Sequence, residues 1–346
     1  MTTPTTTPSG RALGARRTFL AELEDRRHLV AHHPSYADVP AEDQALWKAP
    51  FGPPEDWDVD TFDTTFDGPH GPVPVRVYVP GAAPPPEGRP GLVWIHGGAF
   101  SFGDLDMPEA DATARGVAGR AGAVVVSVDY RLCPVPPELG GGGDERVDSR
   151  GAPVRFPVPH DDCLAAYTAV RDRADALGVD RDRLAIGGAS AGGCLAAGAA
   201  LRLADEGRAP WQLLLVYAVL HPTLPDPEPE LTEALASVPP ALLFATGARD
   251  AINGTYLGDA VPTPYAYAGI APDLSGLPPT YVENAEFDVL RASGERFARQ
   301  LRSAGVDVES HVRRGVPHGH LDCVGLGAAA ATMDALAGRL APSDLL

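Results

Sequence analysis

Apolar strand-like runs alternate with helix-like segments from about residue 60 onwards, and this alternation limits the fold more than any other feature of the sequence. Several of the runs are almost continuously apolar, which suits strands that are covered on both faces. The predicted strands are 75–79 (VRVYV), 91–95 (GLVWI), 123–128 (AVVVSV), 183–187 (RLAIG), 212–217 (QLLLVY), 279–284 (PTYVEN) and 307–312 (DVESHV). The predicted helices between them are 108–121, 161–177, 191–206 and 290–304. This order predicts an α/β fold in which helices flank a mostly parallel central sheet.

Three segments depart from the alternation. Apolar residues at roughly helical spacing predict a helix over 15–33, ahead of a loop rich in proline and acidic residues. Residues 136–155 are rich in glycine and charge, and predict a flexible surface insertion. Residues 221–275 are too long for a plain connection and include a helix-like piece near 231–258, so we expect them to cover a site. The predicted core is therefore 61–220 with 276–346.

The chain carries a formal net charge of −18, which argues against nucleic acid or an anionic membrane as a partner. Its four cysteines, Cys133, Cys163, Cys194 and Cys323, show no CxxC spacing, and we expect reduced, mostly buried thiols. The N-terminal residues contain no apolar block typical of a secretory signal, and no stretch is long enough to span a bilayer. These features predict a cytoplasmic location.

A nucleophile is predicted where strand 183–187 runs into a helix of small residues. Residues 188–192 (GASAG) fit G-x-S-x-G, and this strand–turn–helix setting is that of a nucleophile elbow. The turn would raise the Ser190 hydroxyl above the sheet and aim the Ala191 N–H, at the start of the helix, towards a developing oxyanion. The alternative is a glycine-rich helix start that only packs closely on the sheet.

A serine nucleophile needs a base, and His318 is the best candidate because it lies in a loop just past a predicted strand. Three further histidines follow Ser190 in the chain: His221, His311 and His320. The cluster of His318, His320, Asp322 and Cys323 also allows a metal site, but no second ligand group stands at a recognisable spacing, so we predict no metal.

The acid of the site is expected in the loop after strand 279–284. Asp288 stands directly before the helix 290–304, so it would share the carboxyl edge of the sheet with His318. Glu286 and Glu283 are the alternatives.

The stretch 94–100 (WIHGGAF) interrupts an apolar strand with a histidine and two glycines. Glycine lets the backbone turn so that successive N–H groups stay unpaired, and acyl transfer needs such donors for its oxyanion. We expect His96 to brace this loop through hydrogen bonds. The alternative is a plain tight turn.

Together these segments resemble the bacterial hormone-sensitive-lipase-like carboxylesterases of the α/β-hydrolase superfamily. The resemblance covers roughly 65–325 and rests on ordered segments. These are 67–80 (DGPHGPVPVRVYVP), 94–100, 126–132 (VSVDYRL), 156–163 (FPVPHDDC), 188–193 (GASAGG), 273–291 (DLSGLPPTYVENAEFDVLR) and 316–321 (VPHGHL). It implies a Ser190–His318–Asp288 triad, an oxyanion hole at Gly97, Gly98, Ala99 and Ala191 in which Gly97 shapes the turn, and no cofactor. It also implies a helical cap built from the N-terminal segment 1–60 and the insertion 221–275.

The chain departs from the family pattern at four places. Ala99 replaces the usual third glycine, Ala189 replaces the aspartate before the nucleophile, Cys194 replaces an asparagine, and 136–155 enlarges a short link. None of these changes removes a member of the triad, so they bear on substrate preference and local rigidity.

The sequence therefore predicts a serine hydrolase that cleaves small or medium acyl esters through an acyl-enzyme, with Phe100 and Phe102 as walls of a capped apolar pocket. Three alternatives use the same triad: acyl transfer, opening of an amide or lactone, and a biosynthetic tailoring step. A small-molecule receptor of this fold would be expected to lack a triad member. The expected partner is a small-molecule ester, and association into a homo-oligomer is left open.

Overall fold

The computed structural model describes residues 18–142, 145–244 and 246–341, and its centre is an eight-stranded sheet. The strands are β1 Val59–Phe66, β2 Val73–Pro80, β3 Arg89–Ile95, β4 Val124–Val128, β5 Val179–Ala189, β6 Leu213–Val216, β7 Thr280–Phe287 and β8 Val308–Pro317. Their order is β1-β2-β4-β3-β5-β6-β7-β8. The pairs from β4 to β8 are parallel, whereas β2 pairs antiparallel with both β1 and β4. The predicted α/β fold with a mostly parallel sheet is confirmed.

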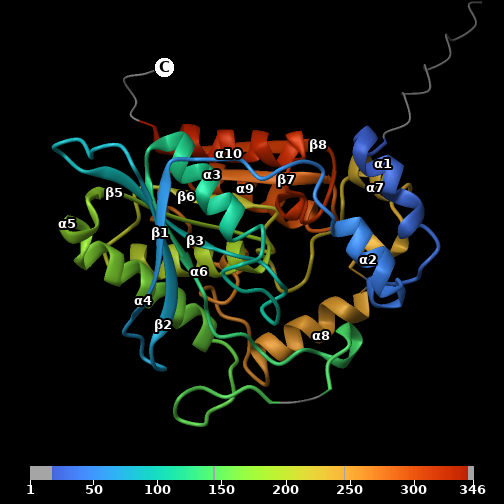
Figure 1. The fold of residues 1–346 in the computed structure, drawn as a ribbon. Helices are drawn as coiled ribbons and strands as arrows, with labels where there is room; N and C mark the ends of the chain where they lie inside the picture. The colour runs from blue at the N-terminus through green and yellow to red at the C-terminus, as the bar shows by residue number, and fades with distance from the viewer. Residues whose placement is uncertain (1–17, 143–144, 245, 342–346) are drawn as a thin grey trace, which may run out of the picture.

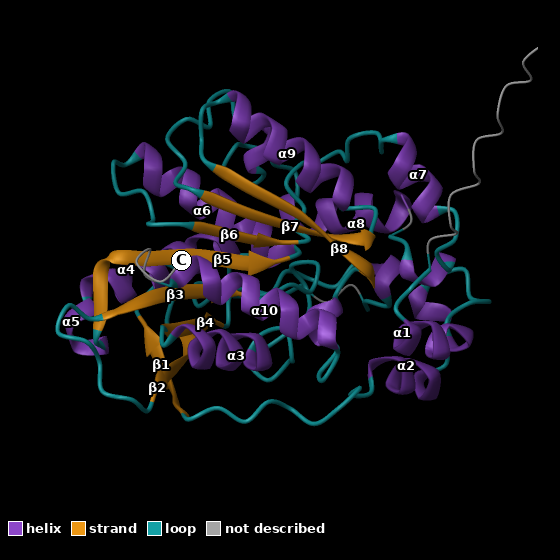
Figure 2. Cartoon of the chain, turned by 90° about the horizontal axis from the view of Figure 1, so that it is seen from above, coloured by secondary structure: helices purple, strands orange, loops and turns teal. Residues whose placement is uncertain are grey.

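Helices cover both faces of this sheet (Figures 1 and 2). They are α1 Ala21–Arg26, α2 Ala41–Lys48, α3 Asp111–Ala121, α4 Val158–Asp172, α5 Ala174–Leu177, α6 Ala191–Asp205, α7 Pro229–Leu235, α8 Thr246–Leu257, α9 Arg291–Ser303 and α10 Gly327–Leu340. Short 3-10 turns are η1 Arg27–Leu29, η2 Tyr36–Asp38, η3 Pro137–Leu139, η4 Pro240–Leu242, η5 Ala268–Ile270 and η6 His320–Asp322.

The sheet divides the hydrophobic core into two layers, because successive strand residues point to opposite faces. Val93 and its neighbours pack under α4, α6 and α9. Trp94, the next residue, is buried in the other layer, under α3 and α10. Burial on both faces explains why the central strands have near-continuous apolar sequences.

The structure corrects several sequence expectations at the ends of the chain. The helix expected over 15–33 is shorter: α1 ends at Arg26 and continues only as η1, and residues 15–17 lie outside the described part. Strand β1 was not predicted because six of its eight residues are exposed and polar residues dominate it. Helix α10 was not predicted either, since alanine and glycine give it little apolar–polar periodicity.

The insertion 136–155 is more ordered than its composition predicts. It contains η3 and an isolated bridge between Val147 and Pro153. Val154 is buried in the core, and the Asp148 carboxylate accepts N–H groups from Arg150 and Ala152. Most of residues 145–153 are exposed, as expected of a surface insertion, but these contacts give its second half a defined conformation; residues 143 and 144 lie outside the described part.

No helix in the described ranges has both the length and the hydropathy needed to cross a membrane.

Candidate active site

Ser190 stands in a tight turn between β5 and α6, with φ 54° and ψ −120°. A positive φ is strained for a residue with a side chain, and such strain is common at functional sites. The flanking glycines make the turn possible. A Cβ on Gly192 would lie 2.1 Å from the Ile95 carbonyl oxygen, and one on Gly188 would lie 2.6 Å from the backbone of Gly192.

His318 and Asp288 meet Ser190 at the carboxyl edge of the sheet. The Nε2 atom of His318 lies 2.9 Å from Ser190 Oγ, and its Nδ1 atom lies 2.7 Å from Asp288 Oδ2. Asp288 is buried, and its other oxygen accepts the Leu290 N–H at 2.9 Å. Each residue follows the end of a parallel strand, β5, β7 or β8, which explains why residues far apart in the sequence come together. Glu286 and Glu283 instead bind Arg314 and Arg313.

The surroundings of His318 favour its protonated form. Burial lowers the pKa of the imidazole, but the neighbouring charges of Asp288, Glu109 and Asp322 outweigh burial, so that the net shift is upward. Two aromatic rings flank the imidazole: Tyr217 at 4.8 Å and Phe244 at 5.0 Å between ring centroids. A proton taken from Ser190 would therefore be held as a stabilised imidazolium.

The His96–Gly97–Gly98 turn places unpaired backbone donors beside Ser190. Gly98 has φ 104°, and a Cβ there would lie 2.0 Å from the Phe102 carbonyl oxygen. No acceptor in the described part of the chain takes the N–H of Gly98 or Ala99. The Ala191 N–H, at the first position of α6, has no partner within its helix.

Gly97 and His96 shape this turn. The Gly97 N–H is donated to the Glu109 carboxylate, so it is not a free donor like those of Gly98 and Ala99. His96 is fully buried, its Nδ1 lies 2.8 Å from the Gly97 carbonyl oxygen, and its ring stacks on Tyr130 at 4.6 Å. Burial lowers the pKa of His96, which keeps the ring neutral.

A cavity of about 50 Å³ opens beside Ser190 under the segment 221–275. Mostly apolar groups line it, and its polar residues are Ser190, His221, Arg249, Asn253 and Tyr267. The lining residues are Ala99, Phe100, Ser190, Ala191, Val219, His221, Pro222, Leu224, Phe244, Arg249, Ile252, Asn253, Tyr267 and Leu290. Phe100 lies in this wall and stacks on Tyr256 at 3.9 Å. Phe102, the other expected wall residue, is 40% exposed and is not part of the described lining, which corrects that expectation.

The remaining histidines near the site have other partners. His221 contacts Ser293 Oγ at 2.8 Å and Gln300 Oε1 at 3.1 Å, and burial lowers its pKa to about 4. His320 is buried, and its Nε2 lies 2.9 Å from Thr332 Oγ1. Within the described residues, no group of three or more histidine, cysteine, aspartate or glutamate side chains could hold a metal. The cysteines of the described part are free thiols, and only Cys323 is not fully buried.

Glu109, Tyr217 and Phe244 are among the residues at the site that were not predicted from the sequence. Tyr217 ends a predicted strand, so its place at the sheet edge could have been inferred from the same reasoning as for Ser190. Glu109 and Phe244 have no local signal, because only tertiary contacts bring them to Gly97 and His318.

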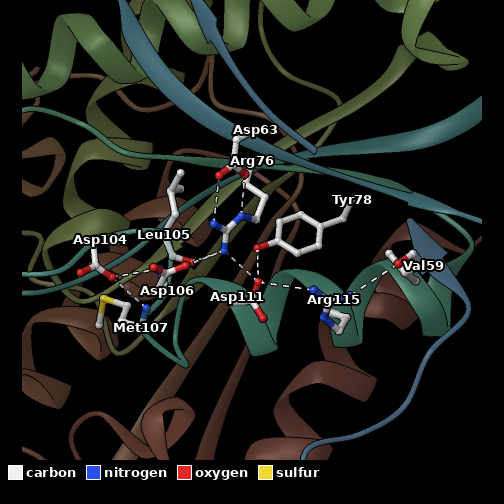
Figure 3. A network of polar contacts seen from close by, with 10 residues as sticks. All are labelled: Val59, Asp63, Arg76, Tyr78, Asp104, Leu105, Asp106, Met107, Asp111 and Arg115. Atoms are coloured by element: carbon white, nitrogen blue, oxygen red, sulfur yellow. Dashed lines mark hydrogen bonds and ion pairs between the residues drawn. The ribbon is translucent and has the colours of Figure 1, made fainter. Parts of the chain in front are cut away.

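The segment that carries Glu109 is fixed by the ion-pair network of Figure 3. Arg76 on β2 binds Asp63 on β1 at 2.7 Å and Asp106 at 2.8 Å, and Tyr78 donates to Asp111 at 2.8 Å. The Asp104 carboxylate accepts the N–H groups of the next turn. These contacts attach residues 104–111, which follow the glycine turn, to the antiparallel edge of the sheet.

Comparison with known proteins gives the same class as the fold and the site. A family model described as alpha/beta hydrolase fold matches residues 92–137 and 146–322. Esterase LipI of Mycobacterium tuberculosis is 35% identical over 275 residues, which are 78% of this chain and 77% of that one. Carboxylesterase NlhH of the same species is 35% identical over 262 residues, 72% of each chain. The solved structure of a hyperthermophilic esterase from Pyrobaculum calidifontis, 29% identical, covers 92% of this chain and 90% of its own, with a TM-score of 0.68.

A parallel sheet with a serine elbow at its carboxyl edge defines the class of α/β hydrolases. The chain belongs to the hormone-sensitive-lipase-like carboxylesterases of the α/β-hydrolase superfamily. It is a carboxylic ester hydrolase, as the resemblance in its motifs implied.

Proposed function

We propose that the chain is a serine carboxylesterase that uses Ser190, His318 and Asp288 to cleave esters with small or medium acyl groups. The observation that carries the proposal is the continuous hydrogen-bonded series from Ser190 Oγ through His318 to Asp288. It lies beside backbone N–H groups that have no acceptor among the described residues.

In the first half-reaction, His318 Nε2 accepts the proton of Ser190 while Oγ attacks the ester carbonyl carbon. Asp288 holds the imidazole through Nδ1 and stabilises the imidazolium. The N–H groups of Gly98, Ala99 and Ala191 donate to the carbonyl oxygen as it becomes an oxyanion, and Gly97 keeps the turn in place. The C–O bond breaks, and the alcohol leaves with the proton from His318.

In the second half-reaction, water attacks the acyl-enzyme. His318 accepts a proton from this water, the acid leaves, and the proton returns to Ser190. All atoms come from the ester and water, so the reaction needs no cofactor.

The size of the cavity favours short acyl groups within this range. About 50 Å³ is far below the roughly 300–1,000 Å³ of pockets that enclose drug-sized ligands. Rates against p-nitrophenyl esters of increasing acyl length should therefore be highest for the shortest chains.

We further propose that the described part of the N-terminal segment 1–60, from residue 18 onwards, and residues 221–275 together form the cap over this cavity; residues 1–17 lie outside the described part. Arg27 donates to the Ser237 carbonyl oxygen at 2.5 Å, and η2 packs against η4. The Phe244 ring of the second segment packs edge-on against the His318 ring, at 85° between the ring planes.

The test is labelling of the purified protein with a fluorophosphonate, together with p-nitrophenyl acetate hydrolysis by wild type and Ser190→Ala. We expect stoichiometric labelling of the wild type only, and loss of hydrolysis in the variant. Unlabelled wild type, or full hydrolysis by Ser190→Ala, would refute the proposal.

A further inference from the structure

Glu109 is a buried carboxylate at the active site that the proposed reaction does not use. Its residue is only 3% exposed, although carboxylates are rarely buried without a specific partner. One carboxylate oxygen accepts the Gly97 N–H, and the other accepts the Tyr217 hydroxyl at 2.5 Å. A single side chain thus joins the glycine turn after β3 to the end of β6.

The contact with Gly97 fixes the turn next to the nucleophile. A Cβ on Gly97 would lie 2.6 Å from Glu109 Oε1 and 2.9 Å from Ser190 Cβ, so this backbone is enclosed between the two side chains. Because Glu109 takes the Gly97 N–H, the turn is held with the next two N–H groups left for a ligand.

The contact with Tyr217 extends this support to His318. The Tyr217 ring lies edge-on to the imidazole, with centroids 4.8 Å apart. The backbone of Glu109 adds two more links: its carbonyl oxygen accepts the Trp94 indole N–H at 2.9 Å, and its N–H donates to Asp322 at 3.1 Å. Asp322 lies in η6, directly after the loop of His318.

The charge of Glu109 acts on the same histidine. Burial raises the pKa of Glu109 to about 7, and the nearby Asp322 charge adds to the shift, whereas Tyr217, Gly97 and His318 oppose it. In return, the Glu109 carboxylate is one of the charges that raise the pKa of His318. Tyr130, after β4, also faces Glu109, and it donates to the Gly97 carbonyl oxygen at 3.0 Å.

We propose that Glu109 is a positioning residue for the esterase reaction: it holds the oxyanion turn through Gly97 and supports the imidazolium of His318 through Tyr217 and its own charge. The inference rests on the proposed function. It assigns no covalent step to Glu109; contacts of Asp106 and Asp111, drawn in Figure 3, attach the segment on either side of Glu109 to β2.

The experiment compares wild type, Glu109→Gln and Glu109→Ala in the pH dependence of p-nitrophenyl acetate hydrolysis. The amide of Glu109→Gln can still accept the Gly97 N–H but has no charge. We expect kcat/KM about 3- to 10-fold lower at about pH 8–9, where the wild-type Glu109 carboxylate is charged, and a smaller difference as pH falls below about 7, where wild-type Glu109 is itself neutral. Glu109→Ala releases the turn as well, so kcat should fall about 10- to 100-fold with KM little changed, up to the roughly 100-fold that loss of an oxyanion donor costs.

The matched control is Glu286→Gln, which also neutralises a buried carboxylate that accepts a backbone N–H, here that of Gly315. It should leave the pH dependence of kcat/KM as it is in the wild type. Thermal unfolding of every variant separates loss of folding from loss of positioning.

If folded Glu109→Gln lowers kcat/KM by the same factor at every pH, the proposal is overturned, since that is the effect of a purely structural role. That result leaves the triad untouched, because the Ser190→Ala and fluorophosphonate tests do not depend on Glu109.

Discussion

At the scale of single residues, the site depends on backbone angles that side chains normally avoid. Ser190, Ala99, Phe100 and Tyr217 all have positive φ, and all four lie at the carboxyl edge of the sheet. Such strain persists only where the surrounding structure over-determines it. At this edge, hydrogen bonds and close glycine contacts supply that constraint.

Replacement of Ala99 by glycine tests how much its methyl group matters. Ala99 has φ 52° and lines the cavity, so Ala99→Gly removes both strain and a wall atom but keeps the N–H. We expect activity on small esters to stay within about threefold, with a shift towards bulkier alcohol groups. The measurement is kcat/KM for acetate esters of small and branched alcohols. An identical ratio of bulky to small substrates in both proteins would contradict the prediction.

Removal of the Asp288 charge should change both the rate and its pH dependence. Burial lowers the pKa of His318, but Asp288 and the other nearby carboxylates raise it overall, so wild-type kcat/KM should fall as pH drops through a value above 6.5. In Asp288→Asn we expect the acid limb, which is the fall of kcat/KM on the acid side of the profile, to lie at lower pH. We also expect kcat to be lower by about 10⁴-fold. A pH–rate profile measures both. A full rate in Asp288→Asn, with the acid limb unmoved, would exclude Asp288 as the partner of His318.

At the scale of elements, α8 is attached to the core by the end of the insertion 136–155. Arg155 donates to the Thr255 carbonyl oxygen at 3.1 Å, near the C-terminus of α8, where a cation stabilises a helix. The next residue, Phe156, donates its N–H to the Tyr256 carbonyl oxygen at 2.7 Å. Since Tyr256 stacks on Phe100, the insertion and the cavity wall form one packed unit.

Arg155→Ala should weaken the attachment of α8 to the core and leave the catalytic residues in place. Loss of a cation at a helix C-terminus costs about 0.3–1 kcal/mol, so we expect KM to rise about two- to fivefold while kcat stays nearly constant. Hydrogen exchange in residues 246–257 should speed up in parallel. Arg150→Ala is the control, because Arg150 is exposed in the same insertion. Its hydrogen bond to Asp148 is made by the backbone N–H, which alanine retains. Equal KM values in Arg155→Ala and Arg150→Ala would refute the claim that Arg155 supports substrate binding by holding α8.

At the scale of the whole molecule, a buried carboxylate joins the last strands to the last helix. Glu283 on β7 binds Arg313 on β8, Thr332 on α10 at 2.5 Å and Tyr281 at 2.8 Å. Burial alone would raise the pKa of Glu283, but the neighbouring His320, at 3.5 Å, and Arg313 lower it from 4.5 to about 2. This network keeps the strand ends that carry Asp288 and His318 in register.

The stability of the protein should therefore depend on pH in the acid range. A carboxylate whose pKa is lowered by folding stabilises the fold at pH values above its pKa in the unfolded state. For Glu283 this contribution is on the order of 3 kcal/mol, and it is lost as pH falls from 4.5 towards 2. Glu283→Gln should lower the free energy of unfolding at pH 7 by about 3–5 kcal/mol and flatten the acid dependence. Urea unfolding at several pH values measures both. The half-exposed Glu309→Gln is the control, and the same acid slope in wild type and Glu283→Gln would disprove the assignment.

Local sequence was enough for the elements whose residues are buried on both faces or end in a tight turn. The runs 91–95 and 123–128 are almost wholly apolar and lie in β3 and β4, and Ser190 of GASAG directly follows β5, as expected. The exposed strand β1 lacked this signal, and the order of 136–155 depends on contacts with α8 that lie about a hundred residues away in the chain.

The sequence by itself determined the class of fold, the serine elbow and the loops of Asp288 and His318, because strand alternation and turn chemistry are local properties. Only the tertiary structure decided which N–H groups of the glycine turn stay unpaired, which phenylalanine faces the cavity, and that Glu109 lies behind Gly97. The physical reason is that hydrogen-bond partners and burial at the sheet edge are set by neighbours from β3, β6, β7 and β8, whose contacts no local pattern records.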